Sequence, residues 1–461
     1  MVAAAVYRRL VIELRPLPHR RAFALAWPAI VGNVTVPLVG LVDTAMLGHF
    51  SDATHIGAVA LGSTVLSAVM WLVGFLRTGT TSLVGRALGA GQDDAAVTHA
   101  QRAAILAVTL GGAAVLAQWV AIPAVMAVLA PAGDIRDLAV QYAWIRMASV
   151  PAALLTLVIS GWFVGSGDTR RPLAIVATVN VVNLGLDIAF VGGLGWDSAG
   201  AAAATVIAEW LGLALALVLW WRAASSPVRA AVRRWRGRGL RTGWRRLAAM
   251  NGDLFVRTAI LYSVLTFVTA YGARLGPDIL AANAILMQLM LLSSYGQDGY
   301  AHAAEAMVSR EIGRRDVPSF HRAVVASALP AVAIGAVFTV LYLVASGPFI
   351  AVLTSIPSVT EAADQYIGWV VWLPLASSLA YLFDGVFLGS GRTRSMVTTM
   401  AASAVLVFVP ALLAGIAWVG DPRNDDLWRA FLLFNVARGV FLGISYVRVT
   451  RQGAWLATAH T

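Results

Sequence analysis

Oxygen-bearing side chains recur in the apolar segments of the first half of the chain. Asn180, Asn183 and Asp187 are spaced three and four residues apart, which puts them on one face of a helix. Asp43 and Thr205 belong to two further apolar segments. Carboxylate, amide and hydroxyl oxygens suit a sodium ion or a proton. We therefore predict a cation-binding site formed by these five residues.

A second set of ionisable residues lies in the apolar segments of the other half. It comprises Arg257, Asp298 and Asp384, which helix geometry places in the same half of the bilayer. Each would cost about 2.5 to 3.5 kcal/mol if it faced lipid at mid-bilayer, so these groups must pair or line a wet cavity. The sequence favours a paired polar network, and leaves open whether it is a structural ion cluster or a substrate or proton relay.

The elements that hold these residues are predicted to be membrane-spanning helices. The 461-residue chain is 59% hydrophobic and 12% charged, against roughly 25% charged residues in soluble domains. Its apolar runs are long enough to cross a hydrocarbon core of about 30 Å. Twelve helices are predicted, over residues 22–48, 56–84, 99–126, 138–164, 171–193, 199–221, 251–272, 280–309, 321–353, 364–388, 395–418 and 427–447.

Loop charges predict the orientation of these helices. Arginines dominate the even-numbered connections, for example Arg170 and Arg171, and acids dominate the odd-numbered ones. Because basic residues near span ends stay on the cytoplasmic side, both termini are predicted to be cytoplasmic, in the plasma or inner membrane. The formal charge of +11 reports this topology and does not predict nucleic-acid binding.

An internal repeat indicates two lobes. Residues 161–170 (GWFVGSGDTR) match residues 385–394 (GVFLGSGRTR) at seven of ten positions, with an offset of 224. Because this offset spans six helices, the fold class is all-α integral membrane, with two parallel-related six-helix lobes. The predicted domains are an N-terminal segment 1–21, an N-lobe 22–221, a basic linker 222–250, a C-lobe 251–447 and a tail 448–461.

The repeat does not extend to the predicted cation site. The same offset places Phe267, Val407 and Ala411 opposite Asp43, Asn183 and Asp187. The scaffold therefore repeats while this chemistry does not, which favours a functional role. Packing through neighbouring amides and hydroxyls is the structural alternative.

Several motifs resemble those of the multidrug and toxic compound extrusion (MATE) family, in its DinF-like branch. The motifs are WPAIVGN at 27–33, VDTAMLG at 42–48, NVVNLGLDIAF at 180–190, GAAAAT ending at Thr205, LAANAILMQ at 280–288 and DGYAHAAE at 298–305. The resemblance covers nearly the whole chain. It implies export of organic compounds against entry of sodium ions or protons.

The resemblance also assigns residues. The N-lobe cation site of the family falls on Asp43, Asn183, Asp187 and Thr205, and the proline associated with bending of the first helix falls on Pro28. A branch typified by NorM has an acid on helix 7. No acidic residue occurs here from Leu254 to Gly272, which argues against a cation site in the C-lobe.

The function predicted from the sequence is secondary active antiport of organic, cationic compounds against H⁺ or Na⁺, by alternating access. Export of an organic anion such as citrate, and flipping of a lipid-linked precursor, are the alternatives. An enzyme is not predicted, since the chain lacks HExxH and GxSxG motifs. We predict no cofactor, no metal beyond Na⁺ at the cation site, small-molecule and bilayer partners, no nucleic acid, and a monomer.

Overall fold

The computed structural model describes residues 17–50, 53–129, 133–233, 243–419 and 423–459. All regular secondary structure in these ranges is helical. The chain forms two compact units, one of Val31–Ala248 and the other of Ala249 onward together with the described residues up to Ile30. We call them the N-unit and the C-unit.

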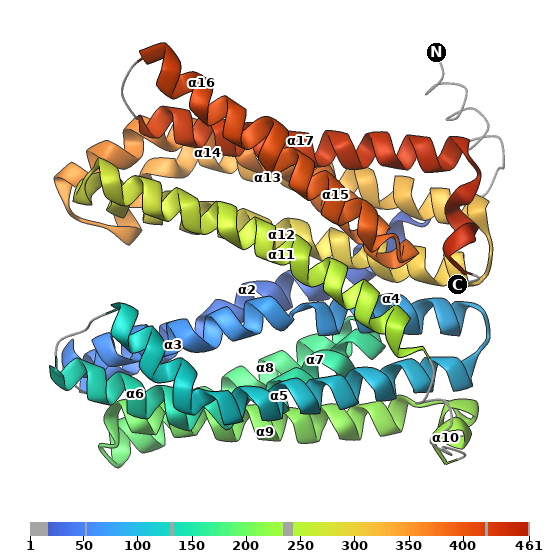
Figure 1. Ribbon diagram of the computed structural model, residues 1–461. Helices are drawn as coiled ribbons and strands as arrows, with labels where there is room; N and C mark the ends of the chain where they lie inside the picture. The colour runs from blue at the N-terminus through green and yellow to red at the C-terminus, as the bar shows by residue number, and fades with distance from the viewer. Residues whose placement is uncertain (1–16, 51–52, 130–132, 234–242, 420–422, 460–461) are drawn as a thin grey trace. The chain divides into compact units, whose positions relative to one another are not determined.

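Helix α2 (His19–Phe50) contributes to both units, because the division falls between Ile30 and Val31. The remaining N-unit elements are α3 (Ala53–Val73), α4 (Phe75–Gly89), α5 (Asp93–Leu129), α6 (Gly133–Met147), α7 (Val150–Gly165), α8 (Arg170–Asp187), the π-helix η1 (Ile188–Gly193), α9 (Asp197–Ala223) and α10 (Ser226–Arg233). Figure 1 shows these helices in blue to green.

The C-unit is built in the same order, from yellow to red in Figure 1. Its elements are α11 (Trp244–Leu275), α12 (Pro277–Gly313), α13 (Val317–Leu353), α14 (Pro357–Ser390), α15 (Thr393–Ser403), the π-helix η3 (Ala404–Phe408), α16 (Val409–Val419), α17 (Asn424–Arg451) and the 3₁₀-helix η4 (Ala454–Ala459). The first turn of α2 contacts the other helices of this unit. His19 Nδ1 lies 3.1 Å from Ala326 O, and Arg21 Nη1 lies 3.9 Å from Glu311 Oε1.

Length and hydropathy identify ten described helices that can cross a membrane, or eleven when α6 and α7, which meet at 46°, count as one span. Together with the 32-residue helix α2, the described segments match the twelve predicted helices. The observed helices run beyond the predicted bounds: α11 begins at Trp244 rather than 251, and α17 ends at Arg451 rather than 447. The apolar run marks only the hydrocarbon core, whereas the helix continues to where arginine heads reach water.

The repeat found in the sequence is also present in the backbone. Gly91 and Arg315, 224 residues apart, both have a positive φ, of 71° and 61°. Gly167 and Gly391, at the same separation, have φ of 81° and 73°. Left-handed residues end helices by turning the chain out of its last turn, so both units use the same two turns between helices.

Candidate functional site

Two of the predicted cation ligands meet in the N-unit, and a third is buried one helical turn away on the same helix. Asn183 and Asp187 on α8 are completely buried, and Thr205 on α9 is 1% exposed. Asn183 Nδ2 donates to Thr205 Oγ1 at 3.2 Å, and this hydroxyl donates to Ala201 O at 3.0 Å. Asn183 Oδ1 is buried and has no hydrogen-bond partner among the described residues. Burying an amide oxygen without a hydrogen bond costs about 1 to 3 kcal/mol of folding free energy. Because this oxygen has no donor in the described part of the chain, it is available to bind a cation.

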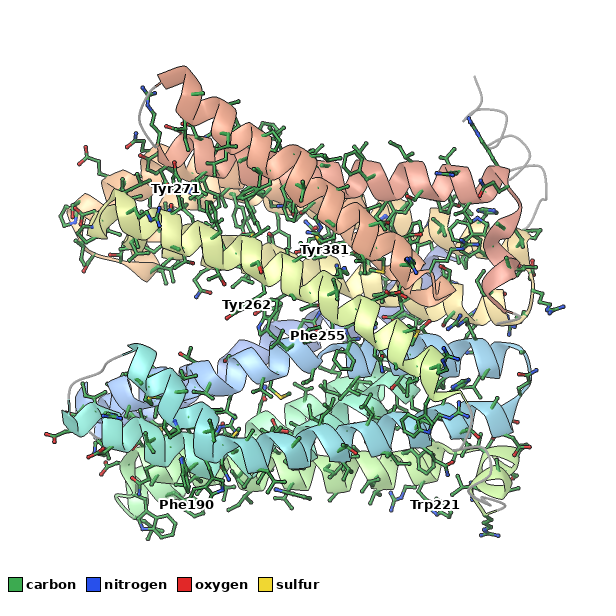
Figure 2. The ribbon with its side chains drawn as sticks, viewed as in Figure 1. Phe190, Trp221, Phe255, Tyr262, Tyr271 and Tyr381 are labelled. Atoms are coloured by element: carbon green, nitrogen blue, oxygen red, sulfur yellow. The ribbon has the colours of Figure 1, made fainter. Side chains whose placement is uncertain are left out.

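Asp187 lies where the backbone changes helical type. It is the last residue of α8 and the N-cap of η1, the π-helical turn from Ile188 to Gly193. Such turns leave the regular hydrogen-bond ladder and are frequent at functional sites. Phe190 in this turn stacks on Trp196, with ring centroids 5.1 Å apart, and Figure 2 shows it pointing outward from the helices of its unit. The buried carboxylate therefore lies at an irregular point of the helix, between α8 and η1.

The other two predicted ligands, Asn180 and Asp43, stay predictions. Asn180 is half-buried, and its Nδ2 donates to Thr35 O at 2.9 Å, so its amide ties α8 to α2. Asp43 belongs to α2 by backbone, but its side chain lies outside the described residues. Pro28 is buried in α2, two residues before the helix passes from the C-unit to the N-unit. Its role in bending stays a prediction.

Tyr142 on α6 is a buried aromatic residue in the same unit that the sequence did not single out. It is 2% exposed and packs with Leu47 of α2, Val191 of η1 and Ala201 of α9. A Cβ at Gly62 on α3 would lie 2.6 Å from the Tyr142 ring, so this glycine gives the ring its room. No sequence motif singles out one tyrosine in an apolar helix, and only tertiary packing brings it close to α8 and α9.

In the C-unit, Asp384 on α14 is held by two arginines. Arg438 Nη2 on α17 donates to Asp384 Oδ2 at 2.9 Å, and Arg257 Nη2 on α11 contacts the same oxygen. Asp384 and Arg438 are buried, with residue exposures of 6% and 3%. Sequence analysis placed Arg257 and Asp384 in one network, but it assigned no role to Arg438, which is 54 residues from Asp384 in the chain.

Further groups surround this ion cluster. Arg438 Nη1 donates to Asn435 at 3.0 Å, and its guanidinium lies 5.9 Å from the ring centre of Tyr381. The Tyr381 hydroxyl donates to Ser294 at 2.6 Å and lies in electrostatic range of Asp298. Figure 2 labels Tyr381 among the helices of this unit. The predicted residues Arg257, Asp298 and Asp384 thus belong to one polar region.

Other titratable groups are more scattered. Glu209 on α9 lies in electrostatic range of Arg146, which donates to Ser149 at the break between α6 and α7. Within the described ranges there is no cluster of three histidine, aspartate or glutamate side chains that could hold a metal ion.

Long apolar helices, internal repetition and buried polar groups together define a multi-pass membrane transporter. The family model MatE matches residues 28–189 and 254–413, which is most of the chain. The chain is also 36% identical to DNA damage-inducible protein F of Escherichia coli, over 94% of this chain and 93% of that protein. The protein therefore belongs to the MATE family.

More distant relatives share this architecture. Protein DETOXIFICATION 44, chloroplastic, of Arabidopsis thaliana is 26% identical over 94% of this chain and 82% of its own. A crystal structure of MATE in the bent conformation has a TM-score of 0.82 at 19% identity, covering 97% of this chain and 98% of that one. The Vibrio cholerae MATE transporter VcmN in the bent form also has a TM-score of 0.82, at 18% identity, over 95% and 98%.

These relationships confirm the all-α membrane fold of MATE type and the resemblance seen in the sequence motifs. The members of the family are transporters of small molecules and not enzymes. The protein is accordingly a multi-pass membrane transporter, and no cofactor is needed for transport of this kind.

Proposed function

We propose that the protein is a secondary antiporter that exports organic cations in exchange for H⁺ or Na⁺ entering through the N-unit. The observation that carries the proposal is the buried group of Asn183, Asp187 and Thr205. A carboxylate with amide and hydroxyl oxygens beside it is suited to a small hard cation. We also propose that Asp43 completes the site from α2. One relative, from Thermotoga maritima, is named a probable multidrug resistance protein, which agrees with an organic cargo.

Coupling requires that the cation and the cargo favour different conformations. We propose that a cation neutralises Asp187 from the outer side and thereby changes the preferred shape of α2, which bends at Pro28. Since α2 passes from the C-unit to the N-unit just beyond Pro28, its shape affects both units. The predicted lobe bounds, cytoplasmic termini, plasma-membrane location and monomeric state are part of this proposal.

The surroundings of the arginines favour a cationic cargo over an organic anion. An anion exporter would need positive groups free to bind its cargo, but Arg257 and Arg438 both contact Asp384. Binding of a carboxylate cargo would have to displace Asp384 from the buried guanidinium of Arg438 and the half-buried guanidinium of Arg257. A buried ion pair that loses one partner costs about 3 to 5 kcal/mol, which makes this exchange unfavourable.

The test is efflux of ethidium, a lipophilic fluorescent cation, from proteoliposomes. An imposed sodium gradient and an imposed pH gradient are applied separately. We expect one of them to accelerate ethidium efflux and Asp187→Asn to abolish that acceleration. The control is Asp134→Asn, an exposed carboxylate at the start of α6, which should behave as wild type. Gradient-independent efflux in the wild type would contradict the proposal.

A further inference from the structure

A groove runs along the C-terminal part of α17. It has a volume of about 630 Å³ and is lined by Val440, Gly443, Ile444, Val447, Arg448, Arg451 and Gln452. These positions follow a helical repeat, so they form one continuous face of α17. Phe383 lies close behind Gly443, since a Cβ at Gly443 would be 3.4 Å from the Phe383 ring.

The chemistry changes along this groove. Val440, Ile444 and Val447 are 47%, 60% and 46% exposed and form an apolar surface within a membrane-spanning helix. Arg448 and Arg451 follow on the same face at the helix end and are exposed. No carboxylate within the described parts of the chain lies within 4.0 Å of either guanidinium. The groove is thus apolar along its length and positively charged at its mouth.

In the N-unit, one face of the C-terminal part of α9 is covered by the chain itself. Ala216, Trp220 and Ala223 of α9 pack in a hydrophobic cluster that includes residues of α7 and α10. Trp220 meets the Trp162 ring edge to face, with centroids 5.7 Å apart. The groove face of α17, in contrast, is exposed.

We propose that this groove binds an anionic phospholipid. The phosphate lies between Arg448 and Arg451, and an acyl chain lies along Val447, Ile444 and Val440. Basic residues at a membrane surface attract anionic lipid. The apolar part of the groove below them offers a contact surface for one acyl chain of that lipid. The site is independent of the cation pocket and of the proposed antiport, so failure of either leaves the other standing.

The test is native mass spectrometry of the full chain after equilibration in bicelles with equal amounts of phosphatidylglycerol and phosphatidylcholine. The wild type is expected to retain phosphatidylglycerol preferentially. Each arginine contributes about a fivefold preference for anionic lipid, so Arg448→Gln with Arg451→Gln should lower the preference about 25-fold. Arg274→Gln, an exposed arginine at the end of α11, is the matched control and should leave the preference unchanged.

A second variant tests the acyl-chain part of the groove. Ile444→Trp places a bulky ring in the apolar part of the groove and should reduce retention of both lipids. Leu433→Trp, at an exposed position outside the groove lining, is its control. Equal retention of the two lipids by the wild type, or an unchanged preference in the double glutamine variant, would overturn the proposal.

Discussion

The buried carboxylates of the two units have opposite surroundings. Asp187 in the N-unit is buried one helical turn from Asn183, whose amide donates to the hydroxyl of Thr205, and both of these neighbouring groups are uncharged. Asp384 in the C-unit is contacted by the guanidiniums of Arg257 and Arg438, which are permanently charged. A carboxylate among neutral oxygens can exchange a cation with the solvent. A carboxylate held by two tethered cations has its charge already balanced by the protein.

The repeat makes this difference informative, because the two units share one scaffold. A π-helical turn follows α8 in the N-unit, at Ile188–Gly193, and another follows α15 in the C-unit, at Ala404–Phe408. The C-unit turn is apolar and ends at Phe408, which packs in a large aromatic core. The scaffold thus tolerates an irregular helix in each unit, while only the N-unit places a carboxylate at it. The comparison supports our proposal of cation exchange in the N-unit and favours a static role for the C-unit cluster.

The largest expected effect breaks the C-unit cluster. Asp384→Asn removes the charge that the two guanidiniums share and should lower the free energy of unfolding by about 3 to 5 kcal/mol. Denaturant unfolding in detergent micelles measures this loss. The exposed control Asp134→Asn should unfold as the wild type does.

A triple variant then separates structure from transport. Replacing the cluster by Arg257→Met, Asp384→Leu and Arg438→Met should recover most of the stability lost in Asp384→Asn, because apolar side chains of similar volume can replace a buried ion triad. A static cluster predicts that ethidium efflux in proteoliposomes is retained. A stable triple variant without efflux would show instead that the cluster takes part in transport.

The next effect concerns the neutral ligands of the N-unit. Thr205→Val removes the hydroxyl that accepts from Asn183 and leaves that buried donor without its partner, a cost of about 1 to 3 kcal/mol. If the hydroxyl helps to hold the cation, the concentration for half-maximal acceleration of efflux should rise about tenfold. Thr205→Ser keeps the hydroxyl and should remain within about twofold of the wild type. Equal behaviour of the two variants would exclude Thr205 from the site.

The smallest effect concerns Asn180, whose amide ties α8 to Thr35 of α2. Asn180→Ala should reduce the free energy of unfolding by about 0.5 to 1.5 kcal/mol, the net value of one hydrogen bond. Because the amide is directed to a backbone carbonyl, the cation concentration dependence of efflux should stay close to that of the wild type. A strong shift in that dependence would place Asn180 among the cation ligands, as the sequence had predicted.

Much of the fold could be predicted from the sequence, because long apolar runs and the repeat of GWFVGSGDTR act locally. The face shared by Asn183 and Asp187 was equally accessible, since it depends on helical spacing alone. The breaks near Gly74 and Ser149, and the π-helical turns, were not predicted, because each lies within an apolar run that predicts one continuous helix. The pairing of Arg438 with Asp384 also requires tertiary structure, since the two residues lie on different helices.

The most direct test of cation exchange at Asp187 is displacement of bound ethidium from purified protein at equilibrium. Fluorescence anisotropy follows the dye while Na⁺ is added, and in a separate titration while the pH is lowered. The account predicts that one of the two titrations releases the dye from the wild type. It also predicts that Asp187→Asn, which is neutral without a bound cation, binds the dye weakly throughout both titrations. Release from Asp187→Asn at the wild-type cation concentration would contradict the account.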